Sequence, residues 1–151
     1  MSGKKAAEEE IAAVRRFNRF YTRELGILRR TFFDTPWTLG EVRVLYEIKH
    51  GASTARDIAR ALNVDAAYLS RLLSKLVKEG LVARKASAHD GRQYELSLTA
   101  RGRAAYDRAD ERQAAQTQSV LARMPAGARK ELVDAMARIE TLMRTRGEEK
   151  R

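Results

Sequence analysis

The fold is decided by residues 62–103, which read LNVDAAYLSRLLSKLVKEGLVARKASAHDGRQYELSLTARGR. Over 66–79 apolar residues recur at three- and four-residue steps, which predicts an amphipathic helix that ends at Gly80. Residues 81–85 and 94–98 then read as two strands around a polar loop that contains Asp90-Gly91-Arg92. The apolar face of the helix is formed by Leu69, Leu72, Leu73, Leu76 and Val77.

The other face of this helix carries small and basic side chains. A helix of this kind followed by a basic hairpin is typical of a winged helix-turn-helix, in which the helix enters the DNA major groove. The hairpin then reaches the flanking backbone or the minor groove. We therefore expect DNA contacts from helix residues Ser70, Arg71, Ser74 and Lys75, and from hairpin residues Arg84 and Lys85.

Two further residues near the helix have two interpretations each. Tyr68 lies in the first helical turn, where it either touches the DNA or packs against the preceding helix. Thr54 either donates to a phosphate or only caps the helix that begins after it, and capping is the preferred interpretation.

Two short helices precede the helix at 66–79, at about 38–50 and 55–62. Thr38 with Glu41 matches a capping box, and Asp65 can cap the helix at 66–79. The helices at 55–62 and 66–79, joined by the turn at Asn63-Val64, form a helix-turn-helix. Residues 38–98 are therefore predicted as one winged helix-turn-helix.

Longer helices are predicted on both sides of this segment. Helical spacing and helix breakers place them at about 8–33, 100–122 and 126–146. Neither terminal group has enough apolar area for a separate domain. We therefore expect one domain over 1–151, mainly α with a small β-hairpin wing, in which 8–33 and 100–146 are dimerisation helices.

The charge balance favours a polyanionic partner. The chain has 30 basic and 20 acidic residues, a net charge of +10. Residues 51–103 hold 10 basic and 5 acidic residues, so half of the surplus falls in the predicted winged helix. Double-stranded DNA is the expected partner, although a generally basic protein would show a similar total.

Several function classes find no support in the sequence. There is no cysteine, which excludes disulfides and thiolate metal sites, and two histidines are too few for a zinc cluster. No apolar run suits a signal peptide or a membrane span, so a cytoplasmic protein is expected. No phosphate-binding loop, HExxH or GxSxG motif appears, so we expect neither catalytic residues nor a cofactor.

The chain resembles the MarR family of bacterial transcriptional regulators. The resemblance rests on DIARALNVDAAYLSR at 57–71, LVKEGLVAR at 76–84, the Asp90-Gly91-Arg92 wing and LSLTARG at 96–102. It implies a homodimer that binds palindromic operators, usually as a repressor. It also implies that Arg92 enters or borders the minor groove and that Asp90 orients it; an ordinary Asp-Gly turn would also explain these residues.

Many family members are released from DNA by small ligands, often aromatic or anionic. Aromatic side chains with one arginine would suit such an effector, although aromatics at helical spacing are more often core residues. The candidates are Phe17, Phe20, Tyr21, Trp37, Arg43 and Tyr46.

The N-terminal stretch also resembles members fused to a C-terminal N-acetyltransferase domain, of which we expect no counterpart in these 151 residues. A regulatory module of an acetyltransferase system is therefore the alternative interpretation. A third interpretation is a protein that coats DNA without sequence preference.

Overall fold

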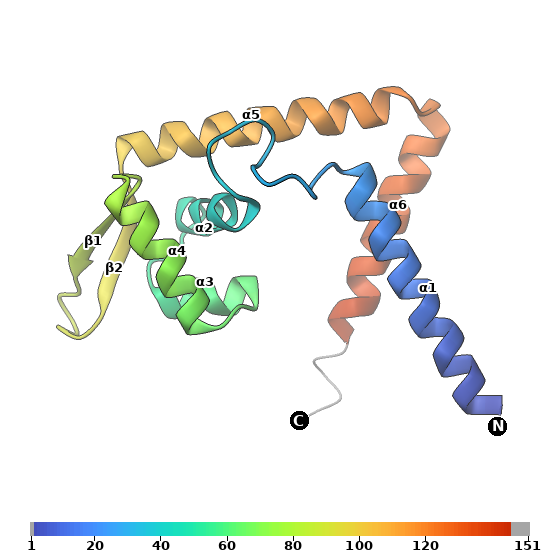
Figure 1. Ribbon diagram of the computed structural model, residues 1–151, viewed down its shortest axis with the longest axis horizontal. Coiled ribbons are helices and arrows are strands. Elements are labelled where there is room, and N and C mark those ends of the chain that lie inside the picture. The colour runs from blue at the N-terminus through green and yellow to red at the C-terminus, as the bar shows by residue number, and fades with distance from the viewer. Residues whose placement is uncertain (1, 146–151) are drawn as a thin grey trace. The chain divides into compact units, whose positions relative to one another are not determined.

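The computed structural model describes residues 2–145 as six helices and one hairpin (Figure 1). The elements are α1 (Ser2–Glu24), α2 (Leu39–Lys49), α3 (Ala55–Leu62), α4 (Ala66–Lys78), β1 (Val82–Ala86), β2 (Tyr94–Leu98), α5 (Ala100–Ala122) and α6 (Ala126–Arg144). The mainly helical fold with a small hairpin wing confirms the predicted fold class. The chain divides into two units at Ala114, within α5. That 1–151 form a single domain stays a prediction.

Side-chain caps fix where the three short helices begin. Thr38 accepts from the backbone N–H of Glu41 at 3.3 Å, and the Glu41 carboxylate accepts from the N–H of Thr38 at 3.1 Å, so the capping box is confirmed. Thr54 and Asp65 cap α3 and α4 by accepting from the backbone N–H groups of Asp57 and Tyr68. Each cap satisfies an N–H that the first helical turn leaves unpaired.

The turn between α3 and α4 depends on one left-handed residue. Asn63 has φ 51° and ψ 50°, and its N–H bonds back to carbonyls of α3. Asparagine tolerates this conformation better than most residues, which explains the abrupt change of direction between the two helices.

We expect Asn63→Gly to keep the stability of the protein and Asn63→Val to lower it by about 1–2 kcal/mol, because a β-branched residue is strained at positive φ. Urea denaturation of both variants measures the difference. Equal midpoints for the two variants would contradict a left-handed turn residue.

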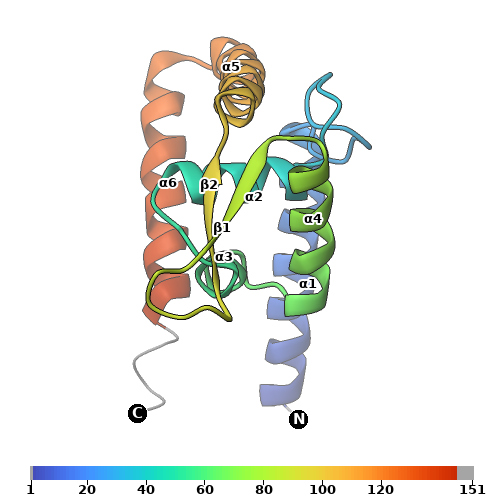
Figure 2. The same ribbon diagram turned by 90° about the vertical axis from the view of Figure 1, so that its left-hand side faces the viewer.

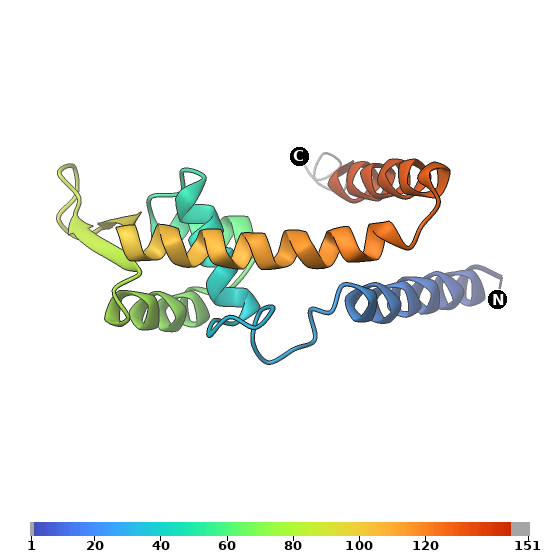
Figure 3. The same cartoon turned by 90° about the horizontal axis from the view of Figure 1, so that it is seen from above.

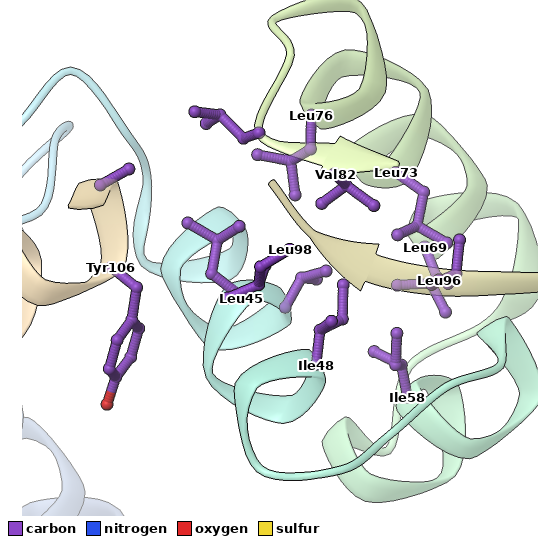
Figure 4. Close-up of a cluster of buried hydrophobic side chains, with 13 residues drawn as sticks. Leu45, Ile48, Ile58, Leu69, Leu73, Leu76, Val82, Leu96, Leu98 and Tyr106 are labelled. Atoms are coloured by element: carbon purple, nitrogen blue, oxygen red, sulfur yellow. The ribbon is translucent and has the colours of Figure 1, made fainter. Parts of the chain in front are cut away.

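The core of the winged helix lies among α2, α3, α4, the hairpin and the start of α5 (Figure 4). Leu45, Ile58 and Leu76 are completely shielded from solvent. They come from three different helices, so burying them holds the helix-turn-helix together. Each contributes about 1.5–3 kcal/mol relative to an exposed side chain. The labelled side chains in Figure 4 converge from both strands as well as from the helices.

The wing is a two-stranded antiparallel hairpin whose base packs on the core. Val82 pairs with Leu98 and Arg84 with Leu96. In β2, Leu96 and Leu98 are buried and Ser97 between them is exposed, which is the period-two pattern of a half-buried sheet, whereas β1 is buried only at Val82. The hairpin packs against α2 and α4 (Figure 2).

The prediction of one helix over 8–33 is wrong at its C-terminal end, since α1 ends at Glu24. Gly26 has φ 69°, which takes the chain out of the helix. Phe32 and Phe33 then fold inward and pack with Val42 and Ala109. The apolar periodicity of the sequence continues through Phe32, but the two rings belong to a loop that folds onto the core and not to the face of a helix.

The C-terminal helices follow the predicted boundaries closely. Figure 3 shows α5 as one uninterrupted helix that begins where the wing ends. Thr99 caps it by accepting from the N–H of Gly102 at 3.0 Å. Met124-Pro125 separates it from α6, as predicted. Among the residues 2–145 that the structure describes, no helix is long and apolar enough to cross a bilayer.

Candidate DNA interface and effector pocket

The recognition helix α4 presents three different faces. Its core face is formed by Leu69, Leu73 and Leu76, all buried. A second face is exposed and carries Ser70, Arg71, Ser74 and Lys78. Of these, the predicted DNA-reading residues Ser70, Arg71 and Ser74 are thus available to a partner.

The third face of α4 points toward the start of α2. A methyl group added to Gly40 would lie 2.6 Å from the hydroxyl of Tyr68 and 3.5 Å from a methyl carbon of Leu72. The hydroxyl end of the Tyr68 ring therefore lies against the start of α2. The side chain remains 37% exposed, and its contact with DNA stays a prediction.

Lys75 lies on this third face as well. Its Nζ donates to Oε1 of Glu41 at 2.6 Å, and the carboxylate of Glu41 is buried. This hydrogen bond raises the pKa of Lys75 above its usual value, with the negative charges of Glu41 and Glu79 adding to the effect and partial burial opposing it. The sequence suggested a DNA contact for Lys75, but its ammonium group is paired within the protein.

The wing carries the remaining predicted contacts on an exposed tip. Oδ1 of Asp90 accepts from the backbone N–H of Arg92 at 3.0 Å, so Asp90 fixes the backbone at Arg92. Arg84 lies over the ring of Tyr94, with 6.0 Å from guanidinium carbon to ring centroid. Lys85 is exposed and pairs in register with Glu95.

One cavity brings the recognition helix and the wing together. It has a volume of about 560 Å³ and is lined by residues of α3, α4 and both strands of the hairpin. Thr54, Ser70, Arg84 and Arg92 all contribute to its wall. Thr54 also caps α3, since its hydroxyl accepts from the N–H of Asp57 at 3.1 Å, and its contact with a phosphate stays a prediction. Four predicted DNA contacts therefore share one concave surface.

A second, smaller cavity of about 210 Å³ lies between α2 and α5. Two predicted effector residues, Arg43 and Tyr46, line it. The other four do not: Phe17 and Tyr21 stack on each other along α1, Phe20 is exposed, and Trp37 packs on the two apolar cores. The remaining lining residues are Phe32, Val42, Tyr106, Asp110 and Gln113.

No local signal in the sequence indicates this cavity, because its walls come from segments about 60 residues apart. Tyr106 and Asp110 are spaced by one helical turn, and their side chains approach to 3.4 Å. Burial raises the pKa of Tyr106, and the neighbouring Asp110 adds to the effect. The phenol is therefore neutral near pH 7 and can donate a hydrogen bond. Arg43 supplies the positive charge at the same site.

Neither site resembles a metal centre. Within the described part of the chain, no three histidine, aspartate or glutamate side chains lie where they could share an ion.

Comparison with known proteins agrees with this geometry. Residues 34–93 match the model of the MarR family. The HTH-type transcriptional repressors Rv2887 of Mycobacterium tuberculosis and Mb2911 of Mycobacterium bovis are each 41% identical over 81 residues. These matches cover 54% of this chain and 58% of each relative, which is less than two thirds of the relatives' length.

Solved structures extend the likeness to most of the chain. The Rv2887 protein of Mycobacterium tuberculosis in complex with p-aminosalicylic acid superposes with a TM-score of 0.63 at 27% identity, covering 85% of this chain and 96% of that one. The PcaV transcriptional regulator of Streptomyces coelicolor gives a TM-score of 0.69 at 21% identity and shows the same fold, covering 85% of this chain and 94% of its own. The chain is therefore similar to MarR-family regulators over residues 34–93, and it shares the fold of such proteins over most of its length.

Proposed function

We propose that the protein is a sequence-specific transcriptional regulator, a ligand-responsive repressor that binds a palindromic operator as a homodimer. The observation that carries the proposal is the concave surface shared by α4 and the wing, with Ser70, Arg84 and Arg92 around one cavity. A recognition helix and a basic hairpin on one surface fit the major groove and the adjacent backbone together.

Exposed apolar side chains on the terminal helices support the homodimer. On α6, Val133, Leu142 and Met143 are more than half exposed, and on α1 the same holds for Ile11 and Val14. Apolar stripes of this kind are typical of helices that pack against a partner. A second copy of the chain would bury them and place two recognition helices about one turn of DNA apart.

Footprinting on bound genomic fragments tests this function. We expect a protected site with two symmetric halves spaced by about 10 bp, and binding that weakens with salt by about 0.9 in log–log slope for each phosphate contact. An asymmetric or absent footprint rejects the proposal. Equal affinity for the selected fragment and random duplex at about 0.15 M salt would instead favour a protein that coats DNA.

The comparisons do not support the acetyltransferase alternative, since the relatives described above are transcriptional regulators and repressors. Sequencing the gene beyond codon 151 tests it directly. An acetyltransferase domain in the same reading frame would favour that alternative.

We further propose that the cavity between α2 and α5 takes a small aromatic carboxylate. Arg43 would pair with the carboxylate, and Phe32 and Tyr46 would contact the ring. The Rv2887 structure contains p-aminosalicylic acid, which has this chemistry.

p-Aminosalicylate at 100 times its Kd should stabilise the wild-type protein by about 2.7 kcal/mol and weaken operator binding. We expect Arg43→Ala to abolish both effects, because the variant loses the charge that pairs with the carboxylate. Thermal unfolding and gel-shift titration measure them. Arg108→Ala, which removes an exposed arginine of α5 outside this cavity, is the control and should respond like wild type. A full response in Arg43→Ala would contradict the assignment.

A further inference from the structure

The contact between Lys75 and Glu41 joins the recognition helix to α2 through two residues that are 34 positions apart in the chain. Only 3% of the Glu41 side chain is exposed, whereas 47% of the Lys75 side chain is. Oε1 of Glu41 accepts from Lys75 and Oε2 accepts from the backbone of Thr38. Both carboxylate oxygens are thus used, one to start α2 and one to hold α4.

The pairing follows from the burial of Glu41. A buried carboxylate without a cationic partner is strongly unfavourable, so removing the partner costs far more than breaking a surface ion pair. The charge of a lysine bound in this way is neutralised by the carboxylate, so the ammonium group is not free to pair with a DNA phosphate. Glu79 approaches the same Nζ to 4.0 Å and reinforces the negative environment.

The pair belongs to a larger contact between the two helices. Tyr68, Leu72 and Lys75 recur at intervals of four and three residues, and all meet the first turn of α2 at Gly40 or Glu41. This flank lies beside the face that carries Arg71 and Ser74. The rotation of α4 about its axis, which decides where Arg71 points, is therefore set against the start of α2.

Resting on the proposed DNA binding, we propose that Glu41 is a positioning residue for operator recognition and that Lys75 serves this contact instead of binding a phosphate. The carboxylate fixes α4 in the orientation that presents Arg71 and neutralises a charge that would otherwise bind DNA of any sequence. Val42, Arg43 and Tyr46 of α2 line the cavity proposed for the effector, so α2 contributes to both sites.

The first experiment needs no DNA. Glu41→Gln keeps an acceptor for the cap but removes the charge, and Lys75→Met keeps the length of the side chain but removes the ammonium group. We expect each variant to lower Tm by at least about 3 °C and the double variant to lower it no further than the worse single one. Additive shifts would overturn the proposed pairing.

The exposed pair Lys130–Asp134 on α6, at 2.7 Å, provides a matched control. Its side chains are 81% and 63% exposed, so Lys130→Met and Asp134→Asn should shift Tm little and show no coupling. If the exposed pair showed coupling as large as that of the buried pair, the double-mutant cycle would not report burial. The cycle would then no longer support the proposed role of Glu41.

The second experiment measures the salt dependence of DNA binding. We expect Lys75→Met to weaken operator binding while leaving the slope of log Kd against log salt unchanged. We expect Glu41→Gln to lower the ratio of operator to random-duplex affinity, because it frees a lysine charge and loosens α4. A role confined to stability would leave that ratio unchanged, which would contradict the proposal.

The slope also separates the two proposals. If Lys75 bound a phosphate, Lys75→Met would flatten the slope by about 0.9 per subunit, or about 1.8 for a dimer, and the inference would be overturned. If the wild-type protein preferred no operator over random duplex, the proposed function would fail, while the thermal cycle would still decide whether Glu41 and Lys75 are coupled.

Discussion

Gly102→Ala, at the start of α5, should strongly destabilise the protein although it adds only a single methyl group. A Cβ at this position would lie 2.0 Å from the carbonyl oxygen of Leu81, which is backbone and cannot rotate away. Alanine gains about 1 kcal/mol over glycine in helix propensity, but overpacking costs about 1–3 kcal/mol and occasionally more. Because the clash is with backbone, we expect a net loss of at least about 2 kcal/mol.

The close approach at Gly102 is part of the joint between the wing and α5. The Leu81 carbonyl accepts from the N–H of Thr99 at 3.1 Å, and the Thr99 hydroxyl donates to the carbonyl of Gly80 at 2.6 Å. Displacing α5 from Leu81 would strain these bonds together. Operator affinity of Gly102→Ala should therefore fall along with its stability, since the hairpin would be displaced from α4.

Gly127→Ala is the matched control. Gly127 lies in the first turn of α6, and no atom lies within 4 Å of an added Cβ. Alanine should stabilise the protein there by about 0.4–1 kcal/mol, chiefly by restricting the unfolded chain. Urea denaturation of the two variants should thus give shifts of opposite sign. A Gly102→Ala protein as stable as Gly127→Ala would show that the contact with Leu81 relaxes at no cost.

Local signals predicted the elements of the winged helix closely. The caps at Thr38, Thr54, Asp65 and Thr99 each satisfy N–H groups of the turn that follows, so they mark helix starts without knowledge of the tertiary structure. The exposed face of α4 and the Asp90 turn were also readable, because period and turn chemistry are local properties.

What the sequence did not predict depends on contacts between distant segments. The apolar period over 8–33 is the same whether Phe32 lies on a helix or in a loop folded onto Val42 and Ala109. Lys75 falls on the polar side of α4, and only the position of α2 shows that Glu41 holds it. The cavity between α2 and α5 likewise combines a loop and two helices, so aromatic spacing along α1 could not show which side chains line it.

Arg71→Ala should cause the largest loss of operator recognition. Arg71 is exposed on α4, so its guanidinium is available to a base edge. A bidentate arginine–guanine contact is worth about 1–3 kcal/mol of discrimination. A dimer loses two such contacts, and a total of about 2 kcal/mol already corresponds to about a 30-fold loss of affinity.

The effect of Arg71→Ala on DNA binding should also differ from the effect of losing a phosphate contact. Arg71→Ala is expected to lower operator affinity by about 30-fold or more while random-duplex affinity changes much less, because a base contact carries sequence information. Arg92→Ala on the wing should weaken both kinds of DNA by a more similar factor and flatten the salt slope. Arg108→Ala removes an exposed charge that belongs to α5 and to neither of these elements, and it should leave the operator preference intact. If Arg71→Ala kept the wild-type ratio of operator to random-duplex affinity, α4 would not be reading bases through this residue.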